Sequence, residues 1–297
     1  MTSKIIQAKA RLRRSRLYIP GNNPAMIQDA IIYGADSLIL DLEDSISIDE
    51  KDSARYLVRN ALLDLDFGNC EITVRINAQD TKYHLKDLEE IIPAKPDCIL
   101  IPKTETVEEI IKIDKLISSI EKENKITQEY VALMPIIESA KGVLNVEAIA
   151  SGPRVVAIGL GGEDLTADIG AKRTKEGREL EYISSKIILA CAANKIQAID
   201  TVFTDINDLE GLFNATVKAI EIGFQGKSVI HPSQIETVHK AFIPTDQELE
   251  RAEKIVNAYK NAKKKGLGVV SVDGRMVDIP VVRRSEKILK WAKASKK

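Results

Sequence analysis

Short apolar runs recur along the chain, and stretches with the periodicity of helices separate them. Most of the runs are continuous rather than alternating, which is typical of parallel strands covered on both faces. We therefore expect eight buried strands. The runs are Arg16–Pro20, Ser37–Asp41, Glu71–Arg75, Cys98–Pro102, Ala132–Ile137, Val155–Gly159, Gln197–Asp200 and Lys227–Ile230.

The stretches between the runs carry apolar residues at helical spacing. Thr106 to Lys122 is the clearest example, and Glu181 to Asn194 follows the same pattern. Strands that alternate with helices indicate right-handed βαβ crossovers and a parallel sheet. Eight such units in a chain of 297 residues favour a closed (β/α)8 TIM barrel over a doubly wound sheet.

The barrel is expected to span residues 1–244, which leaves 245–297 as a C-terminal extension of helices and a hairpin. A barrel does not need this extension in order to close. Its expected elements are a helix over Thr245–Lys265 that ends at Gly266–Gly268, a hairpin over Val269–Asp278 that turns at Asp273–Gly274, and a helix from about Val282 to Lys293.

Charge and composition exclude several classes of function. Lysine and arginine total 43 against 44 acidic residues, so there is no electrostatic case for nucleic acid or an anionic membrane as the main partner. No apolar run approaches the about 18 residues needed to span a bilayer. The first residues lack the apolar segment of a secretory signal, and the three cysteines are far apart. We expect a cytoplasmic protein with reduced thiols.

Polar and charged residues follow nearly every expected strand. In a TIM barrel these positions converge on one face, where catalytic groups lie. The residues are Asp41, Glu43 and Asp44 after the second strand, Arg75 and Asn77 after the third, Lys103 after the fourth, Glu138 after the fifth, Glu163 and Asp164 after the sixth, Asp200 at the seventh and His231 after the eighth.

Two carboxylates on neighbouring strands predict a metal site. Glu138 and Asp164 would lie within bridging distance of one cation, and Gly161 and Gly162 let the backbone approach a ligand closely. Two carboxylates with waters and substrate oxygens suit Mg2+. The alternative is that both acids only cap the helices that follow their strands. The convergence of further charged groups favours the metal site.

The other charged residues have two interpretations each. Arg75 could bind a substrate carboxylate or a growing oxyanion with its guanidinium fork, or it could form an ion pair with Asp41 or Glu43. Lys103 could bind substrate or neutralise the acids, and a Schiff base is disfavoured because nearby acids keep it protonated. Asp41, Glu43 and Asp44 are expected to orient Arg75 and metal-bound waters.

Several longer motifs stand in order along nearly the whole chain: Arg14–Pro24, Tyr33–Ser37, Asp41–Ser45, Val74–Asn77, Pro102–Thr104, Ile137–Ser139, Gly161–Asp164, Gly226–Ser228 and Gly274–Asp278. Together they resemble the citrate lyase β-subunit family. This family lies among the HpcH/HpaI-type aldolases with the malyl- and citramalyl-thioester lyases.

The resemblance implies a (β/α)8 barrel that assembles as a homotrimer. It implies cleavage of citryl-[acyl carrier protein] to oxaloacetate and acetyl-[acyl carrier protein], together with an acyl carrier protein subunit and an acyl-transferase subunit. Residues matching Glu138 and Asp164 bind Mg2+ in the family, and one matching Arg75 binds substrate. An aspartate matching Asp278 acts as acid/base from the extension of a neighbouring subunit, so the extension is expected on a barrel mouth.

This interpretation agrees with the chemistry of a citryl thioester. The hydroxyl lies on the carbon beside the bond to be broken, and a bound metal lowers its pKa. Asp278 is the candidate base for that proton. Arg75 is the candidate partner for the enolate of the departing acetyl thioester.

One motif departs from the pattern and keeps an alternative open. The chain has His231–Gln234 (His-Pro-Ser-Gln) after its last strand, where many citrate lyase β subunits have asparagine in place of His231. The His-Pro-Ser-Gln form resembles the coenzyme A thioester lyases more closely. A stand-alone lyase for citramalyl-, malyl- or citryl-coenzyme A is therefore the second hypothesis, and a non-catalytic scaffold subunit is the third.

Overall fold

The computed structural model describes residues 4–264, 266 and 268–295. The chain divides into two compact units, Met1–Val238 and His239–Lys297. This division falls within helix α11 (Ser233–Phe242), six residues before the boundary expected from the sequence. No helix among the described residues is long and apolar enough to cross a membrane.

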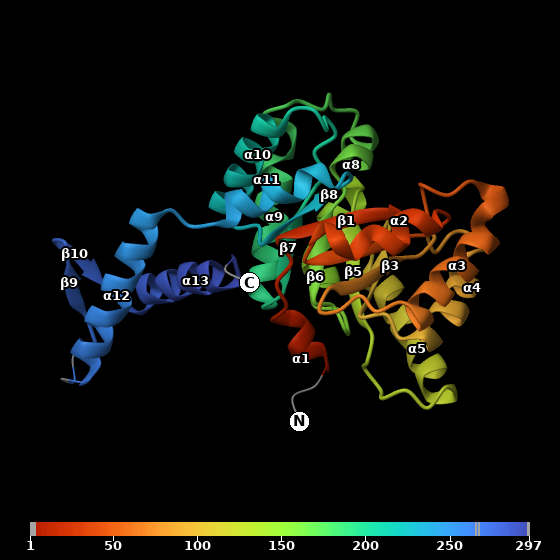
Figure 1. Ribbon diagram of the computed structural model, residues 1–297, viewed down its shortest axis with the longest axis horizontal. Coiled ribbons are helices and arrows are strands. Elements are labelled where there is room, and N and C mark those ends of the chain that lie inside the picture. Colours follow the sequence, from red (N-terminus) through yellow and green to blue (C-terminus); the bar gives the residue numbers. More distant parts are fainter. Residues whose placement is uncertain (1–3, 265, 267, 296–297) are drawn as a thin grey trace. The chain divides into compact units, whose positions relative to one another are not determined.

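The first unit is a closed barrel of eight parallel strands in the order of the sequence (Figure 1). The expected (β/α)8 fold is confirmed. Each predicted strand is present, and its ends lie within two residues of the prediction. The strands are β1 (Ser15–Pro20), β2 (Ser37–Asp41), β3 (Glu71–Arg75), β4 (Cys98–Ile101), β5 (Ala132–Ile137), β6 (Ala157–Leu160), β7 (Gln197–Asp200) and β8 (Gly226–Val229).

Helices connect the strands and surround the barrel (Figure 1). The predicted helix of the fourth crossover begins at Val107 because Thr106 and Glu109 form a capping box. It buries Ile110 and Ile117 against the barrel. The helices are α1 (Lys4–Lys9), α2 (Pro24–Asp29), α3 (Lys51–Asp64), α4 (His84–Ile91), α5 (Val107–Glu123), α6 (Ala140–Leu144), α7 (Val146–Ala150), α8 (Gly162–Asp168), α9 (Glu181–Ala193), α10 (Leu209–Ile222) and α11.

The middle of the barrel is filled by apolar side chains. One buried cluster joins residues from β2, β4, β5, β6 and β7, which lie on different sides of the closed sheet. These side chains therefore meet across the interior and form the core of the barrel. The cluster contains Ile39, Cys98, Leu100, Ala132, Met134, Ile136, Val156, Ala157 and Ile199.

The second unit contains the predicted helices and hairpin. Helices α12 (Asp246–Lys264) and α13 (Ile279–Ser295) pack together with strands β9 (Val270–Val272) and β10 (Arg275–Val277). The hairpin turns at Asp273–Gly274, where both residues have positive φ. Lys265 and Leu267, at the predicted end of the first helix, lie outside the described residues.

The last helix begins earlier than the sequence suggested. It starts at Ile279 rather than near Val282, because Asp278 Oδ1 accepts a hydrogen bond of 3.3 Å from the backbone N–H of Val281. This contact satisfies one of the free donors at the start of the helix.

Candidate active site

The barrel brings most of the predicted site residues to the C-terminal ends of its strands. Asp41 and Arg75 are the last residues of β2 and β3, and they are register partners. Lys103 lies two residues after β4, Glu138 follows β5 directly, and Asp164 lies in the first turn of α8 after β6. These positions face one mouth of the barrel, as the parallel topology requires.

Arg75 is held by three carboxylates. Its Nε and Nη2 donate to the two oxygens of Asp41 at 2.6 and 2.7 Å. Its Nη1 contacts Glu43 at 2.9 Å and Asp44 at 3.2 Å. Burial alone would lower the pKa of Arg75, but the bonds from Asp41 raise it well above its ordinary value. The guanidinium fork is therefore occupied by Asp41, and Arg75 is a fixed positive charge in the cavity wall.

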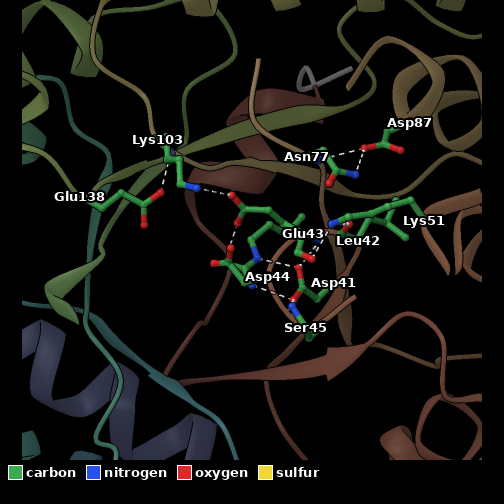
Figure 2. Close-up of polar contacts among 11 residues, drawn as sticks. Asp41, Leu42, Glu43, Asp44, Ser45, Lys51, Asn77, Asp87, Lys103 and Glu138 are labelled. Carbon is green, nitrogen blue, oxygen red and sulfur yellow. Dashed lines mark hydrogen bonds and ion pairs between the residues drawn. The ribbon is translucent and has the colours of Figure 1, made fainter. Parts of the chain in front are cut away.

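Asp41 and Lys51 hold the loop after β2 in place, and the role of Lys51 was not expected from the sequence. Asp41 accepts hydrogen bonds from the backbone N–H groups of Glu43 and Ser45. Lys51 Nζ, from the first turn of α3, donates to the carbonyls of Leu42 at 2.9 Å and Glu43 at 2.7 Å (Figure 2). A lysine at a helix start normally indicates solvent exposure, so this role had no sequence signal.

Asn77 anchors the next loop in a comparable way. Its backbone N–H and its side-chain amide both donate to Asp87 of α4, at 2.9 and 2.7 Å (Figure 2). The other oxygen of Asp87 accepts from Arg55 Nε. The loop that follows β3 is thereby tied to two surrounding helices.

Lys103 links Glu43 to Glu138 across the mouth (Figure 2). Its backbone N–H donates to Glu138 Oε1 at 2.5 Å, and its Nζ lies 3.4 Å from Glu43 Oε1. Partial burial would lower the pKa of Lys103, but the charge of Glu43 and other acids raises it. The ammonium therefore stays protonated, which argues against a Schiff base.

The surroundings of Glu138 favour the binding of a cation. The carboxyl is 6% exposed, and burial raises its pKa to about 8, with further contributions from the charges of Glu43 and Asp164. It does not cap the following helix, because Ser139 occupies the N-cap and accepts from the N–H of Gly142. The capping interpretation therefore fails for Glu138, while Asp164 does lie in the first turn of α8.

Gly161 leaves room beside Glu138. A Cβ at this position would lie 2.5 Å from both Cβ and Oε2 of Glu138. Glu138 and Asp164 both line two adjoining cavities, of about 440 and about 400 Å3. No group of three or more His, Cys, Asp or Glu side chains in the described part of the chain is arranged around a metal site. Two hard oxygen ligands fit Mg2+, which retains several waters, better than they fit Zn2+.

Two further predicted residues have local roles in the chain. Asp278 belongs to the second unit, where it caps α13. His231 is exposed after β8, and its Nδ1 lies 2.7 Å from Ser233 Oγ. Gln234 is buried instead, and it accepts from the backbone N–H groups of Ile230 and His231. The His-Pro-Ser-Gln motif thus ties the end of β8 to the start of α11.

The mouth of this barrel combines a carboxylate pair with a fixed arginine and a protonated lysine. A family model described as HpcH/HpaI aldolase/citrate lyase matches residues 14–232. The chain belongs to that family. It is accordingly a carbon–carbon lyase, and the family match covers all eight barrel strands.

The similarity of this lyase to its relatives extends beyond the barrel. The citrate lyase subunit beta of Leuconostoc mesenteroides subsp. cremoris is 45% identical, over 96% of this chain and 95% of the relative. The mitochondrial citramalyl-CoA lyase of Rattus norvegicus is 35% identical, over 96% of this chain and 87% of the relative. Both alignments therefore include much of the second unit, which the family match leaves out.

A solved structure is similar over the same length. The protein CitE of Mycobacterium tuberculosis, in complex with magnesium, acetoacetate and coenzyme A, has a TM-score of 0.79 and 30% identity. The comparison covers 96% of this lyase and 99% of that chain.

Proposed function

We propose that this lyase is the β subunit of a citrate lyase and cleaves citryl-[acyl carrier protein] to oxaloacetate and acetyl-[acyl carrier protein]. The observation that carries the proposal is the pair Glu138 and Asp164, which lines one cavity with Arg75. The Leuconostoc relative supports the choice of citrate lyase over other family activities.

Glu138 and Asp164 would hold one Mg2+. When bound, the ion neutralises charge and lowers the pKa of the substrate hydroxyl. The raised pKa of Glu138 and the space left by Gly161 support this assignment. Magnesium in the CitE complex is consistent with the same choice of ion.

The remaining steps fall to side chains of the lyase. Asp278, from the second unit of a neighbouring subunit in a homotrimer, removes the proton of the hydroxyl. The bond between the carbinol carbon and the acetyl methylene then breaks, which leaves the ketone of oxaloacetate and the enolate of the acetyl thioester. The enolate carbon takes up one proton to give acetyl-[acyl carrier protein]. Arg75 and Lys103 supply positive charge near the cavity while this negative charge develops.

The assembly follows from the proposed reaction. A citryl group on a carrier requires an acyl carrier protein subunit and an acyl-transferase subunit that loads it. We propose both as partners of this chain. The second candidate is a stand-alone lyase for citramalyl-, malyl- or citryl-coenzyme A, which the His231–Gln234 motif and the Rattus relative favour.

Purified protein with Mg2+ should be offered each thioester in turn, with release of the oxo acid as the readout. We expect citryl-[acyl carrier protein] to be cleaved fastest. If both citryl thioesters are inert and citramalyl-coenzyme A is cleaved, the second candidate replaces the first. If Glu138→Ala and Asp164→Ala leave the activity of the assembled complex unchanged, the chain is a scaffold subunit.

A further inference from the structure

Arg16 lies inside the barrel without a hydrogen-bond partner for most of its guanidinium. The residue belongs to β1 and is 1% exposed. Within the described part of the chain, neither its Nε nor its Nη2 meets an acceptor. The buried hydroxyls of Ser37 and Thr73, on β2 and β3, likewise have no partner there. Buried polar groups are nearly always satisfied, so the unpartnered guanidinium nitrogens of Arg16 indicate a missing ligand.

The carboxylate that interacts most strongly with the charge of Arg16 already has another hydrogen-bond partner. Glu71 contributes most to the favourable charge interactions of Arg16. Both oxygens of Glu71, however, accept hydrogen bonds from Arg13, at 2.7 and 2.5 Å. An arginine remains charged in a protein interior, and a buried charge without a direct partner is costly.

Arg16 forms part of the wall of the catalytic cavity. It lines the same space of about 440 Å3 as Arg75, Glu138 and Asp164. Gly159 of β6 also lines this space, and a Cβ built there would have no neighbour closer than 3.8 Å. The cavity therefore continues from the mouth into the barrel and reaches the unpartnered guanidinium.

The two cations described above at the mouth, Arg75 and Lys103, already contact carboxylates. Arg75 is in contact with Asp41, Glu43 and Asp44, and the ammonium of Lys103 lies beside Glu43. A substrate with a second carboxylate would meet an excess of negative charge there. Arg16 is the cation along this cavity wall that has no carboxylate in direct contact among the described residues.

We infer that Arg16 forms a carboxylate subsite that determines the specificity of this lyase for a dicarboxylic oxo-acid group. This inference rests on the proposed function. A citryl group carries a carboxymethyl arm on its carbinol carbon, and a citramalyl group carries a methyl there. Arg16 binds the carboxylate of the arm in a charge-assisted pair, and a methyl gains nothing from it. Ser37, whose hydroxyl also has no partner among the described residues, is the register partner of Arg16 on β2.

Binding of the two products separates this subsite from the rest of the site. Calorimetry with Mg2+ would compare oxaloacetate, which retains the arm, with pyruvate, which has a methyl. In Arg16→Met we expect oxaloacetate affinity to fall about tenfold or more, as for loss of a charge-assisted bond. Pyruvate affinity should change less than about threefold. Lys112→Met, at an exposed position on α5 away from this cavity, should leave the ratio of the two affinities unchanged.

Turnover provides a second measurement. The ratio of kcat/KM for citryl over citramalyl thioester should fall about tenfold in Arg16→Met. An equal loss for both thioesters, or an unchanged ratio, would overturn the inference and leave Arg16 a structural residue. If wild-type protein binds oxaloacetate through Arg16 but cleaves no citryl thioester, the proposed function fails and the subsite stands.

A structure of the wild-type protein with oxaloacetate and Mg2+ gives a result even if Arg16→Met does not fold. The inference predicts a carboxylate oxygen within hydrogen-bond distance of the Arg16 guanidinium. Water or a free anion at Arg16, with the arm directed to Lys103 or to solvent, would contradict it.

Discussion

At the N-terminal end of the barrel strands, buried charges meet in matched pairs, whereas at the C-terminal end carboxylates outnumber cations. Arg13 and Glu71 form a two-bonded pair that is almost fully buried, and Arg14 pairs with Asp36 through two bonds as well. Each of these four charges has its partner within the chain, so neither pair needs a ligand to be neutral. Arg16, the second residue of β1, differs from them because most of its guanidinium has no partner among the described residues.

The mouth lacks this balance. Five carboxylates gather near three cations there: Asp41, Glu43, Asp44, Glu138 and Asp164 near Arg75, Lys103 and Lys51. Burial also raises the pKa of Glu43 to about 7. Charges that are paired within the chain stabilise the fold, whereas charges without such a partner are available to bind a ligand. Perturbed acids in a cavity are typical of the second kind.

The largest expected effect comes from removing an unbalanced charge at the mouth. Glu138→Gln should lower kcat/KM by about a thousandfold, since it removes a proposed metal ligand. The melting temperature without Mg2+ should not fall, because the substitution removes a buried acid that is surrounded by other negative charges. Steady-state kinetics and thermal unfolding measure the two effects.

Glu105→Gln is the matched control for this variant. Glu105 lines an adjoining cavity but is neutralised by Lys141 at 2.9 Å. Its replacement should change kcat/KM less than about threefold. If kcat/KM falls by a similar factor in both variants, pairing with a cation does not distinguish structural acids from acids that bind a ligand.

Glu71→Gln tests the opposite end of the barrel. It leaves the buried Arg13 without a charged partner, with only the neutral Gln197 oxygen still accepting from its Nη1. The free energy of unfolding should fall by about 3–5 kcal/mol, measured by urea denaturation. The kcat/KM of the folded protein should stay the same. The double variant Arg13→Met/Glu71→Leu should recover at least half of the stability. A loss of activity that exceeds the unfolded fraction would show that the two ends are coupled.

The strands and the strand-end residues could be predicted from the sequence because both depend on local patterns. Continuous apolar runs marked the barrel, and parallel topology placed Asp41, Arg75, Lys103 and Glu138 together. The resemblance predicted the family, which the comparisons confirm.

What the sequence did not provide were contacts made by long side chains. Arg75 had two interpretations, and only its bonds to Asp41 in the structure show that the fork is occupied. Lys51 and Arg16 depend on where a flexible side chain ends, which residue spacing does not determine. The early start of α13 depends on the side chain of Asp278, which caps the helix. The role of Asp278 as acid/base stays a prediction.

The pH dependence of Mg2+ binding tests the electrostatic origin of the site. Burial raises the pKa of Glu138 to about 8, so the carboxyl is protonated below that pH and a metal must displace the proton. Affinity should therefore rise with pH up to about 8, by about tenfold per unit when one proton is released. Calorimetry in buffers of different ionisation enthalpy would count the proton. If the affinity for Mg2+ does not change between about pH 6 and 8, Glu138 is not a ligand that must lose a proton before it binds the metal.

Lys51→Met should have the smallest effect, because Lys51 acts only on the backbone of the loop after β2. Loss of its bonds to Leu42 and Glu43 should cost about 1–2 kcal/mol of stability and lower kcat about fivefold. Affinity for Mg2+ should not change, since Glu138 and Asp164 follow other strands. Lys112→Met, at an exposed position on α5, is the control and should alter none of these quantities. If Mg2+ affinity falls together with kcat in Lys51→Met, the loop after β2 and the carboxylate pair form one unit rather than two independent parts of the mouth.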